Sequence, residues 1–357
     1  MDLFGDLPPP AATSPSKPDA LFGDLPRASS SCTTPPGALR PSSADGDEEP
    51  LAKRKPSAGC PALRGFVAHR RGERDEMQDA FRVDDSFLSS LAAVPHDVAS
   101  MSYYGVFDGH AGAKAAVYCA EHLHTHVASL FPKGESENPD AAIRKSLVEA
   151  FRQTDKAFLQ KATAVSPAWK DGCTAVTTLL VNDTLHVANL GDSKALLCRA
   201  DSSCPGGVKV LPLSKDHSPS QYDERQRIQK AGGAIRDGRI LGVLEVSRSI
   251  GDGRFKGLGV SNTPDVRRMQ LVADDRFVLM ACDGLFKAFG CKEAVERANA
   301  LLDDESLDLK PPAAGEKPDP MRARCEAVCD RLCVEAVKRG CSDNVTVMLI
   351  RIEHQSA

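Results

Sequence analysis

The sequence lacks a long apolar run, an excess of one charge and an N-terminal signal segment. No stretch approaches the length of a membrane span, and the first residues contain no charged segment followed by an apolar core. The net charge is −4 with both signs interspersed, which gives no electrostatic reason to expect nucleic acid as a general partner. We therefore expect an intracellular monomer with no membrane and no nucleic-acid partner.

The sequence also lacks the short, loop-rich clusters of cysteine that are typical of disulfide scaffolds. Its 12 cysteines are scattered through expected helices and strands, which favours reduced thiols. Cys325, Cys329 and Cys333 recur every four residues on one expected helix, a spacing that fits either a metal or redox cluster or a buried face. We favour the buried face, because Leu332 and Ala336 share it and free cysteine behaves as a small core residue.

The composition divides the chain into two parts. Residues 1–60 are rich in Pro, Ser, Ala and Asp and have little apolar periodicity, which predicts a disordered tail. From about Leu63 onward the pattern is dense, and the 41% apolar content of the chain permits a real core. We expect residues 61–354 to form the folded domain.

Two features of the tail suggest roles. The hexapeptide LFGDLP occurs at residues 3–8 and again at 21–26, which suggests a docking element, although a biased segment also duplicates by chance. Lys53, Arg54 and Lys55 form a basic run that is either a nuclear import signal or a solvated charge cluster. The import reading predicts a protein that is both cytoplasmic and nuclear.

Alternating apolar segments predict an α+β domain. The expected strands are Gly65–Ala68, Tyr103–Phe107, Ala175–Val181, Thr184–Leu190, Ala195–Cys198, Phe277–Cys282 and Val345–Ile352, with a two-residue turn at 182–183. The expected helices cover about residues 111–130, 143–158, 220–231, 292–302 and 321–339. Strands in the middle with helices outside predict an antiparallel β-sandwich of two sheets, flanked by helices on both faces in four α-β-β-α layers.

Four aspartates sit at the ends of apolar runs. Asp108, Asp192 and Asp283 each follow one, and Asp343 stands just before one. If the strand before Asp283 and the strand after Asp343 are antiparallel, both carboxylates fall at the same edge of a sheet. Crowded carboxylates repel one another and need a cation, and hard divalent ions prefer such all-oxygen ligands.

Two neighbouring segments add groups that suit phosphate chemistry. Gly109 lets the backbone approach a ligand closely, and His110 is placed to bind a metal or to act as a general acid. On the stretch GERDEMQDA, which we expect to be extended, the Arg74 guanidinium suits phosphate capture and Asp79 suits orienting a metal-bound water. Each segment alone would more simply be a turn or a surface salt-bridge patch.

The sequence lacks the motifs of several other kinds of enzyme that act on phosphate groups. It contains no HCxxGxxR thiolate loop, no GxxxxGK[ST] phosphate loop and few clustered histidines. In their order, the segments GERDEMQDA, VFDGHAG, DGCTA, ANLGDSKA, RIQKAGG, LEVSRSIGD, ACDGLF and SDNVTV resemble the metal-dependent serine/threonine phosphatases of the type 2C class. The resemblance covers about residues 63–353, so the 61–354 domain is expected to be such a phosphatase.

The resemblance implies an enzyme that hydrolyses phosphoserine and phosphothreonine with a water activated by two Mg²⁺ or Mn²⁺ ions. It implies that Asp108 bridges both metals, that the Gly109 carbonyl binds one, and that Asp283 and Asp343 complete the other. It further implies that Arg74 holds the substrate phosphate and that His110 protonates the leaving alkoxide. Asp79, Gln78 and Asp192 would lie around these ligands.

The sequence departs from the class pattern at two positions. Gln78 stands where the class commonly has a glutamate, and a neutral amide adds no charge to help hold the second metal. Lys287 stands where the class often has an aspartate that pairs with the one at Asp192 to hold a third metal. We expect the Lys287 ammonium either to lie beside Asp192 in place of that metal or to point into solvent.

The resemblance also implies partners. Phosphorylated proteins are the expected substrates, and the segments MDLFGDLP, PAWKDG and LGVLEVSRSIGDG resemble a group within the class that is associated with a signalling kinase and its complexes. The alternative is a catalytically weak, phosphate-reading scaffold that acts through its N-terminal tail. The presence of Asp108, Asp283, Asp343 and Arg74 together argues for the enzyme, since a scaffold has little need for all four.

Overall fold

The computed structural model describes residues 60–134, 136–311 and 317–354. The tail with both LFGDLP copies and the basic run at 53–55 lies outside these residues, so the expectations for it stay predictions.

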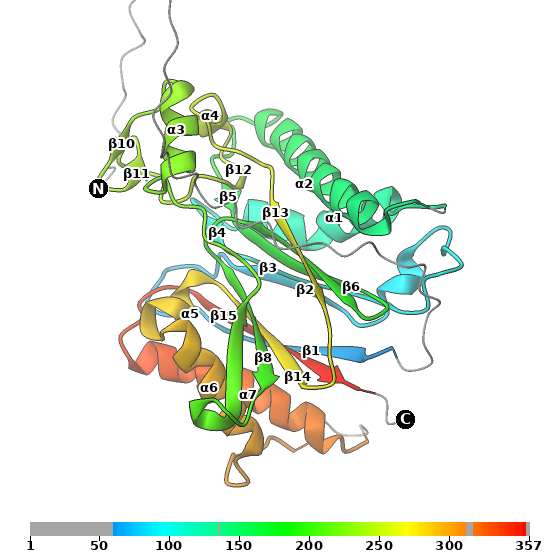
Figure 1. Ribbon diagram of the computed structural model, residues 1–357. Coiled ribbons are helices and arrows are strands. Elements are labelled where there is room, and N and C mark those ends of the chain that lie inside the picture. The colour runs from blue at the N-terminus through cyan, green and yellow to red at the C-terminus, as the bar shows by residue number, and fades with distance from the viewer. Residues whose placement is uncertain (1–59, 135, 312–316, 355–357) are drawn as a thin grey trace, which may run out of the picture. The chain divides into compact units, whose positions relative to one another are not determined.

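Two five-stranded antiparallel sheets lie against each other in the described domain (Figure 1). In spatial order the first sheet contains β1 (Ala62–Arg70), β15 (Val345–Glu353), β14 (Asp275–Ala281), β8 (Lys194–Ala200) and β9 (Val208–Pro212). The second contains β13 (Asp265–Gln270), β7 (Thr184–Leu190), β6 (Ala175–Val181), β3 (Met101–Phe107) and β2 (Ala80–Asp84).

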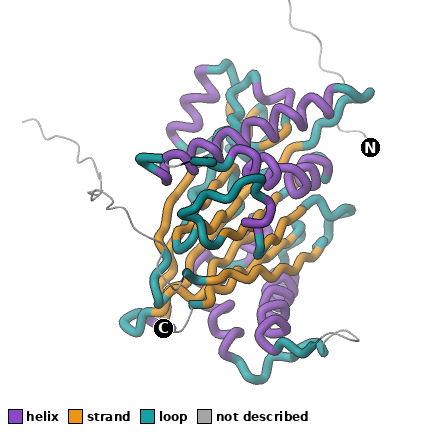
Figure 2. The backbone as a smooth tube through the Cα atoms, turned by 90° about the vertical axis from the view of Figure 1, so that its right-hand side faces the viewer, coloured by secondary structure: helices purple, strands orange, loops and turns teal. Residues whose placement is uncertain are grey.

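Helices cover the outer face of each sheet, which gives four layers (Figure 2). The second sheet packs against α1 (Lys114–Leu130) and α2 (Pro139–Thr163). The first sheet packs against α5 (Asp283–Ala288), α6 (Cys291–Asp303) and α7 (Pro320–Lys338). Short 3₁₀ turns occur at Phe87–Ser90 and Pro205–Gly207. The predicted α+β sandwich is therefore confirmed.

The central strands are apolar on both faces because both faces are covered. Tyr104 and Val106 of β3 point into the core between the sheets, whereas Tyr103 and Phe107 pack under α1 and α2. Each of β3, β6 and β7 has seven residues, and all of them are buried. An antiparallel sheet with one wet face would instead alternate apolar and polar residues.

A smaller unit stands beside the sandwich and contains residues 217–263, which we call the α3–α4 unit. It includes α3 (Tyr222–Lys230), the hairpin of β10 (Ile235–Arg236) and β11 (Arg239–Ile240), and α4 (Gly253–Lys256). Its own small core gathers Ile228, Ile240, Leu244, Val246, Phe255 and Val260. The unit joins the sandwich through a three-stranded sheet of β12 (Ile250–Gly251), β5 (Gly172–Cys173) and β4 (Gly109–His110).

Several predictions for individual elements are confirmed. β6 and β7 begin and end where expected, with Asn182 at φ +56° in the turn between them. β14 and β15 pair antiparallel, with Ala281 opposite Val347. Cys325, Cys329 and Cys333 lie in the buried core between α7 and the first sheet, as the packing interpretation required.

Two expectations are wrong in detail. The helix expected from residue 111 begins only at Lys114, because Ala111 (φ +57°) and Gly112 (φ +133°) adopt left-handed backbone that a helix cannot contain. The stretch around Arg74 is not extended. It forms turns that include Gly72 at φ +66°. The position requires glycine, because a Cβ there would lie 2.2 Å from the Asp343 carbonyl oxygen.

Candidate metal and phosphate site

The strand ends meet at one cleft of about 260 Å³. All four aspartates predicted from the strand ends line it, namely Asp108, Asp192, Asp283 and Asp343. Gln78, Gly109, His110, Arg74 and Lys287 line it as well. Asp79 is not part of the lining. It is buried, and its Oδ2 accepts a hydrogen bond from Thr346 Oγ1 at 2.7 Å. The structure thus brings every predicted site residue into one place.

The carboxylates at the cleft destabilise one another as anions. Burial and the charges of Asp79 and Asp283 raise the pKa of Asp108 well above its usual value. Burial also raises the pKa of Asp192 to about 7, with a further contribution from Asp283, and the pKa of Asp79 to about 6. Oδ1 of Asp79 is buried without a hydrogen-bond partner in the described structure. An oxygen-rich site of this kind fits hard divalent cations.

Cys282 is a neighbour of this cluster that the sequence reasoning missed. One ligand atom each from Asp79, Asp108 and Cys282 lie within 4.8 Å of one another. Burial raises the pKa of the Cys282 thiol well above its usual value, so it remains protonated at neutral pH. Its sulfur accepts a hydrogen bond from the backbone N–H of Thr346 at 3.1 Å, and the hydroxyl of the same Thr346 binds Asp79. Its only signal in the sequence was its position next to Asp283.

Lys287 contacts two of the aspartates directly. Its Nζ lies 2.7 Å from Asp283 Oδ2 and 2.6 Å from Asp343 Oδ2. Burial would raise the pKa of Asp343, but Lys287, together with the Asn344 amide and Arg74, outweighs burial and lowers that pKa. Neither expectation for Lys287 is therefore met, because among the described residues its ammonium pairs with these two carboxylates and not with Asp192. α5 begins at Asp283, and four residues further along a helix Lys287 lies on the same face.

The cation beside Asp192 is Lys194. Its Nζ forms an ion pair with Asp216 and donates a hydrogen bond to the Asp192 carbonyl at 3.5 Å. The Lys194 charge opposes the increase in the pKa of Asp192 that burial causes. Lys194 is part of the ANLGDSKA segment, but sequence reasoning gave it no role.

Arg74 stands on a loop that the Asp343 segment holds in place. Its guanidinium pairs with the Asp343 carboxylate, with Nε 3.0 Å from Oδ1 and Nη2 3.0 Å from Oδ2. The Asn344 side chain fixes the loop. Its Oδ1 accepts a hydrogen bond from the backbone N–H of Gln78 at 2.7 Å, and its Nδ2 donates one to the Arg71 carbonyl at 2.7 Å. The Arg74 side chain remains 57% exposed, so it is accessible to a ligand in the cleft.

Gly109 and His110 belong to the short strand β4. A Cβ on Gly109 would lie 2.2 Å from the Gln78 carbonyl oxygen, which explains the glycine. His110 Nε2 lies 2.7 Å from Oδ2 of the buried Asp252. Burial lowers the pKa of His110, but the nearby carboxylates, Asp252 first among them, outweigh it and raise the pKa above its usual value. A histidine held in this way is suited to donate a proton from its other ring nitrogen.

Asp252 is a site residue that sequence reasoning did not single out. It follows Gly251 in the LEVSRSIGD segment and has φ +52°, a left-handed conformation that is uncommon for aspartate. Its Oδ2 also accepts from Ser249 Oγ at 2.6 Å. Gly172 leaves room for the pair, because a Cβ there would lie 2.2 Å from Asp252 Oδ2 and 2.4 Å from His110 Nε2.

Comparisons with known proteins identify the family of this chain. The protein phosphatase 2C family pattern matches residues 64–345. The integrin-linked kinase-associated serine/threonine phosphatase 2C of Bos taurus is 46% identical, over 99% of this chain and 100% of that protein. A probable protein phosphatase 2C 8 of Arabidopsis thaliana is 36% identical, over 80% of this chain and 77% of that protein.

Solved structures share the fold. The serine-threonine phosphatase 2C of Toxoplasma gondii matches with a TM-score of 0.65 and 20% identity, over 84% of this chain and 97% of that one. A C. elegans sex determining protein also matches with a TM-score of 0.65 and 23% identity, over 82% of this chain and 65% of that one. A search of the described residues for a helix with the length and hydropathy of a membrane span finds none.

The kinase-associated group that the sequence resembled is therefore the integrin-linked kinase-associated phosphatases, and the resemblance is confirmed by 46% identity along almost the whole chain. The matched family pattern covers every residue that lines the cleft, and it covers the sandwich apart from the first residues of β1 and nearly all of β15. The chain belongs to the protein phosphatase 2C family and is a metal-dependent protein phosphatase.

Proposed function

We propose that this enzyme removes phosphate from phosphoserine and phosphothreonine in proteins, with two Mg²⁺ or Mn²⁺ ions in the cleft. The observation that carries the proposal is the convergence of Asp108, Asp283 and Asp343 on one cleft, next to Arg74 and His110. Asp108 would be shared by both ions, the Gly109 carbonyl would bind one, and Asp283 and Asp343 would bind the other. Asp79, Gln78 and Asp192 would orient these ligands and metal-bound water.

Bound ions of this kind supply an activated water and neutralise the phosphoryl oxygens. The side chains of the protein would bind the phosphate and supply the proton. Arg74 offers a planar, permanently charged fork that suits the phosphate oxygens, and its exposure leaves it free to exchange Asp343 for substrate. His110, held through Nε2 by Asp252, has Nδ1 available to protonate the serine or threonine oxygen as the P–O bond breaks.

Phosphate release from a phosphothreonine peptide tests this function. The protein is incubated with Mn²⁺, with Mg²⁺ or with a chelator. We expect release with either metal and none with chelator, and the two metals are compared at equal free concentration. A folded protein that binds the peptide but releases no phosphate with any divalent metal would support the scaffold alternative.

The relatives at 46% identity are named for association with integrin-linked kinase. We infer that this enzyme acts in kinase signalling, with integrin-linked kinase or its complexes as a partner. Co-purification of the full chain with that kinase tests the inference, with a chain lacking residues 1–60 as the comparison for the LFGDLP repeat. Loss of binding on truncation identifies the tail as the docking element, and equal binding assigns it to the phosphatase domain.

We also propose that the protein is cytoplasmic and nuclear and works as a monomer. The support for import is the basic run at residues 53–55. Replacing Lys53, Arg54 and Lys55 with alanine should reduce nuclear accumulation, and an unchanged distribution would contradict the import signal. Light scattering of the purified chain checks the mass.

A further inference from the structure

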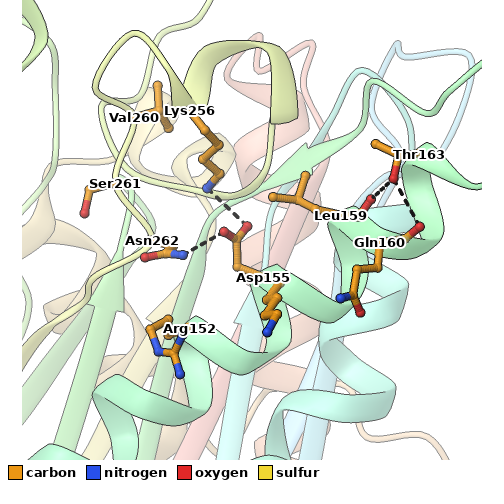
Figure 3. A pocket seen from close by; sticks show the side chains of 10 residues that line it. Arg152, Asp155, Leu159, Gln160, Thr163, Lys256, Val260, Ser261 and Asn262 are labelled. Atoms are coloured by element: carbon orange, nitrogen blue, oxygen red, sulfur yellow. Dashed lines mark hydrogen bonds and ion pairs between the residues drawn. The ribbon is translucent and has the colours of Figure 1, made fainter. Parts of the chain in front are cut away.

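A second cavity, of about 590 Å³, lies between α2 and the segment from Lys256 to Asn262 (Figure 3). One residue in its wall is Asp155 of α2, which is only 2% exposed. A buried carboxylate is costly unless charged or polar partners compensate it. Because the proposed function gives Asp155 no role, its partners are informative.

Three groups of a single chain segment compensate Asp155. Its Oδ1 accepts from the Gly251 amide at 2.8 Å and lies 3.1 Å from Lys256 Nζ. Its Oδ2 accepts from Asn262 Nδ2 at 2.7 Å, and Figure 3 shows the Lys256 and Asn262 side chains directed at the carboxylate from the facing segment. Asp155 therefore ties α2 to the stretch of chain that carries Asp252.

That stretch has an unfavourable backbone. Gly251 (φ +84°) and Asp252 (φ +52°) are consecutive left-handed residues, and such a turn persists only where its surroundings hold it. On one side the Asp252 amide donates to the Asp171 carbonyl at 3.0 Å. On the other side the Gly251 amide is held by Asp155. The Lys256 ammonium also donates to the Ser249 carbonyl at 2.7 Å, which fixes the residue whose hydroxyl binds Asp252.

The turn decides where the Asp252 carboxylate points. With this backbone, Asp252 Oδ2 lies 2.7 Å from His110 Nε2. A change of φ at Asp252 to an ordinary negative value would swing the side chain away from the imidazole. The Asp155 carboxylate is thus connected to His110 through one amide, one strained turn and one side-chain contact.

We propose that Asp155 is a positioning residue for the His110 and Asp252 pair. By holding the Gly251 amide it fixes the left-handed turn, and with it the orientation of the His110 ring. This inference rests on the proposed role of His110 as the proton donor to the leaving oxygen. A residue that only stabilised the fold would affect all phosphate esters alike, whereas one that acts through the acid affects esters according to their need for protonation.

The test compares two substrates with different leaving groups. A phosphothreonine peptide leaves a strongly basic alkoxide and needs the acid, while p-nitrophenyl phosphate leaves a stabilised phenolate and needs it little. Asp155→Ala should lower kcat for the peptide about 10- to 100-fold, which is less than the full contribution of a general acid, about 10²- to 10⁴-fold, because His110 is misplaced and not removed. Turnover of p-nitrophenyl phosphate by the same variant should change less than about threefold, since the acid term is small there.

A matched control comes from the neighbouring residue. Thr154 is also fully buried on α2, but its hydroxyl donates to the Ala150 carbonyl and contacts His126, away from Gly251. Thr154→Val should leave the ratio of the two rates unchanged. If Asp155→Ala does not fold, Asp155→Asn serves instead. Its single amide oxygen cannot satisfy three donors, so the ratio should shift in the same direction by a smaller factor.

A double mutant separates positioning from other effects. In a His110→Ala background, Asp155→Ala should change the rate ratio no further, because residues that act through one another are not additive. Equal losses on both substrates, or a further change of the ratio without His110, would overturn the inference. An enzyme that is active on the peptide while its Asp155 variants keep the wild-type ratio refutes only this inference, whereas an inactive wild type refutes the proposed function itself.

Discussion

Lys287 Nζ lies 2.6 Å from Oδ2 of Asp343, and the same ammonium lies 2.7 Å from Asp283 Oδ2. The cleft therefore holds a positive charge of its own between two of the carboxylates proposed as metal ligands. An ammonium at this position stabilises the metal-free carboxylates, and it also repels an arriving cation. Metal binding and the Lys287 ion pairs should compete.

Lys287→Met should consequently raise the affinity for Mn²⁺. The substitution keeps most of the side-chain volume and removes only the charge. We expect the dissociation constant to fall about tenfold, a modest factor because Lys287 is 45% exposed and its charge is screened by solvent. Calorimetric titration measures it, with Lys292→Met as the control, since Lys292 is exposed and pairs with Glu296. An unchanged or weaker affinity would mean that the ammonium moves aside without cost.

Arg74→Ala should weaken substrate binding and turnover without weakening metal binding. The Arg74 guanidinium is proposed to bind phosphate, and its bidentate pairing with Asp343 shows that it can serve two oxygens at once. We expect kcat/KM on a phosphopeptide to fall about 100-fold, close to the loss of a charge-assisted bidentate contact. Arg74→Lys should recover little, because a point charge cannot replace the fork. A clear drop in Mn²⁺ affinity for Arg74→Ala would contradict the assignment.

Sequence patterns predicted the fold well where apolar periodicity determines the structure. β6 and β7 were placed to the residue because each is a continuous apolar run bounded by the turn at Asn182. The edge strand β13, with sequence DVRRMQ, was missed because all six of its residues are exposed or half-buried and form no apolar pattern.

The sequence predicted the carboxylates that line the cleft, but not the residues that hold the cleft in shape. Asp108, Asp283 and Asp343 follow from strand ends, whereas Asp252 depends on a left-handed turn that no periodicity encodes. Asp155 looks in the sequence like an ordinary polar residue beside Thr154 on a helix. Only the fold places it against Gly251. Lys287 was misplaced because the helix α5 was not predicted, and its direction follows from that helix.

Asp108→Asn should abolish activity and yet stabilise the metal-free protein. The carboxylate is proposed as the shared metal ligand, so its loss removes turnover. In the metal-free state the same carboxylate is buried beside Asp79 and Asp283, which disfavours its charge, so a neutral amide relieves the repulsion. With chelator present, we expect the melting temperature of Asp108→Asn to exceed that of the wild type by a few degrees, on the order of 1 kcal/mol.

With Mn²⁺ added, the wild type should melt at the higher temperature, because the metal binds the folded wild type and stabilises it more than it stabilises Asp108→Asn. Thermal melts with and without metal therefore test both halves of the prediction. A metal-free variant that melts below the wild type would show that Asp108 has a structural role that outweighs the repulsion.

Glu224→Gln should loosen the α3–α4 unit in a pH-dependent way. Glu224 is 3% exposed and accepts hydrogen bonds from Arg227 at 2.6 and 2.8 Å and from Arg248 at 2.7 Å. Burial raises its pKa, but these guanidinium groups and the Ser247 hydroxyl outweigh burial and lower the pKa well below its usual value. The charged form is therefore favoured in the folded protein, and its loss should cost about 1 to 3 kcal/mol of unfolding free energy.

The sign of the pH dependence follows from that lowered pKa. Because the folded-state pKa lies below the unfolded value of about 4.3, the ionised group contributes its full stability above that value. The contribution is lost as the pH falls through the interval between the two values. The difference in unfolding free energy between wild type and Glu224→Gln should hence be constant from about pH 5.5 to 8 and shrink below about pH 4. Urea denaturation across this range measures it.

We also expect Glu224→Gln to weaken substrate binding at the cleft, and Glu335→Gln is a matched control for that effect. Glu335 also accepts from two arginines, Arg297 and Arg331, but it lies on α7, outside the α3–α4 unit. Both variants should lose stability, whereas only Glu224→Gln should raise KM for a phosphopeptide, since Val243, Leu244 and Val246 of its unit line the cleft. Equal KM values for the two variants would show that the unit keeps its position at the cleft without the Glu224 ion pairs.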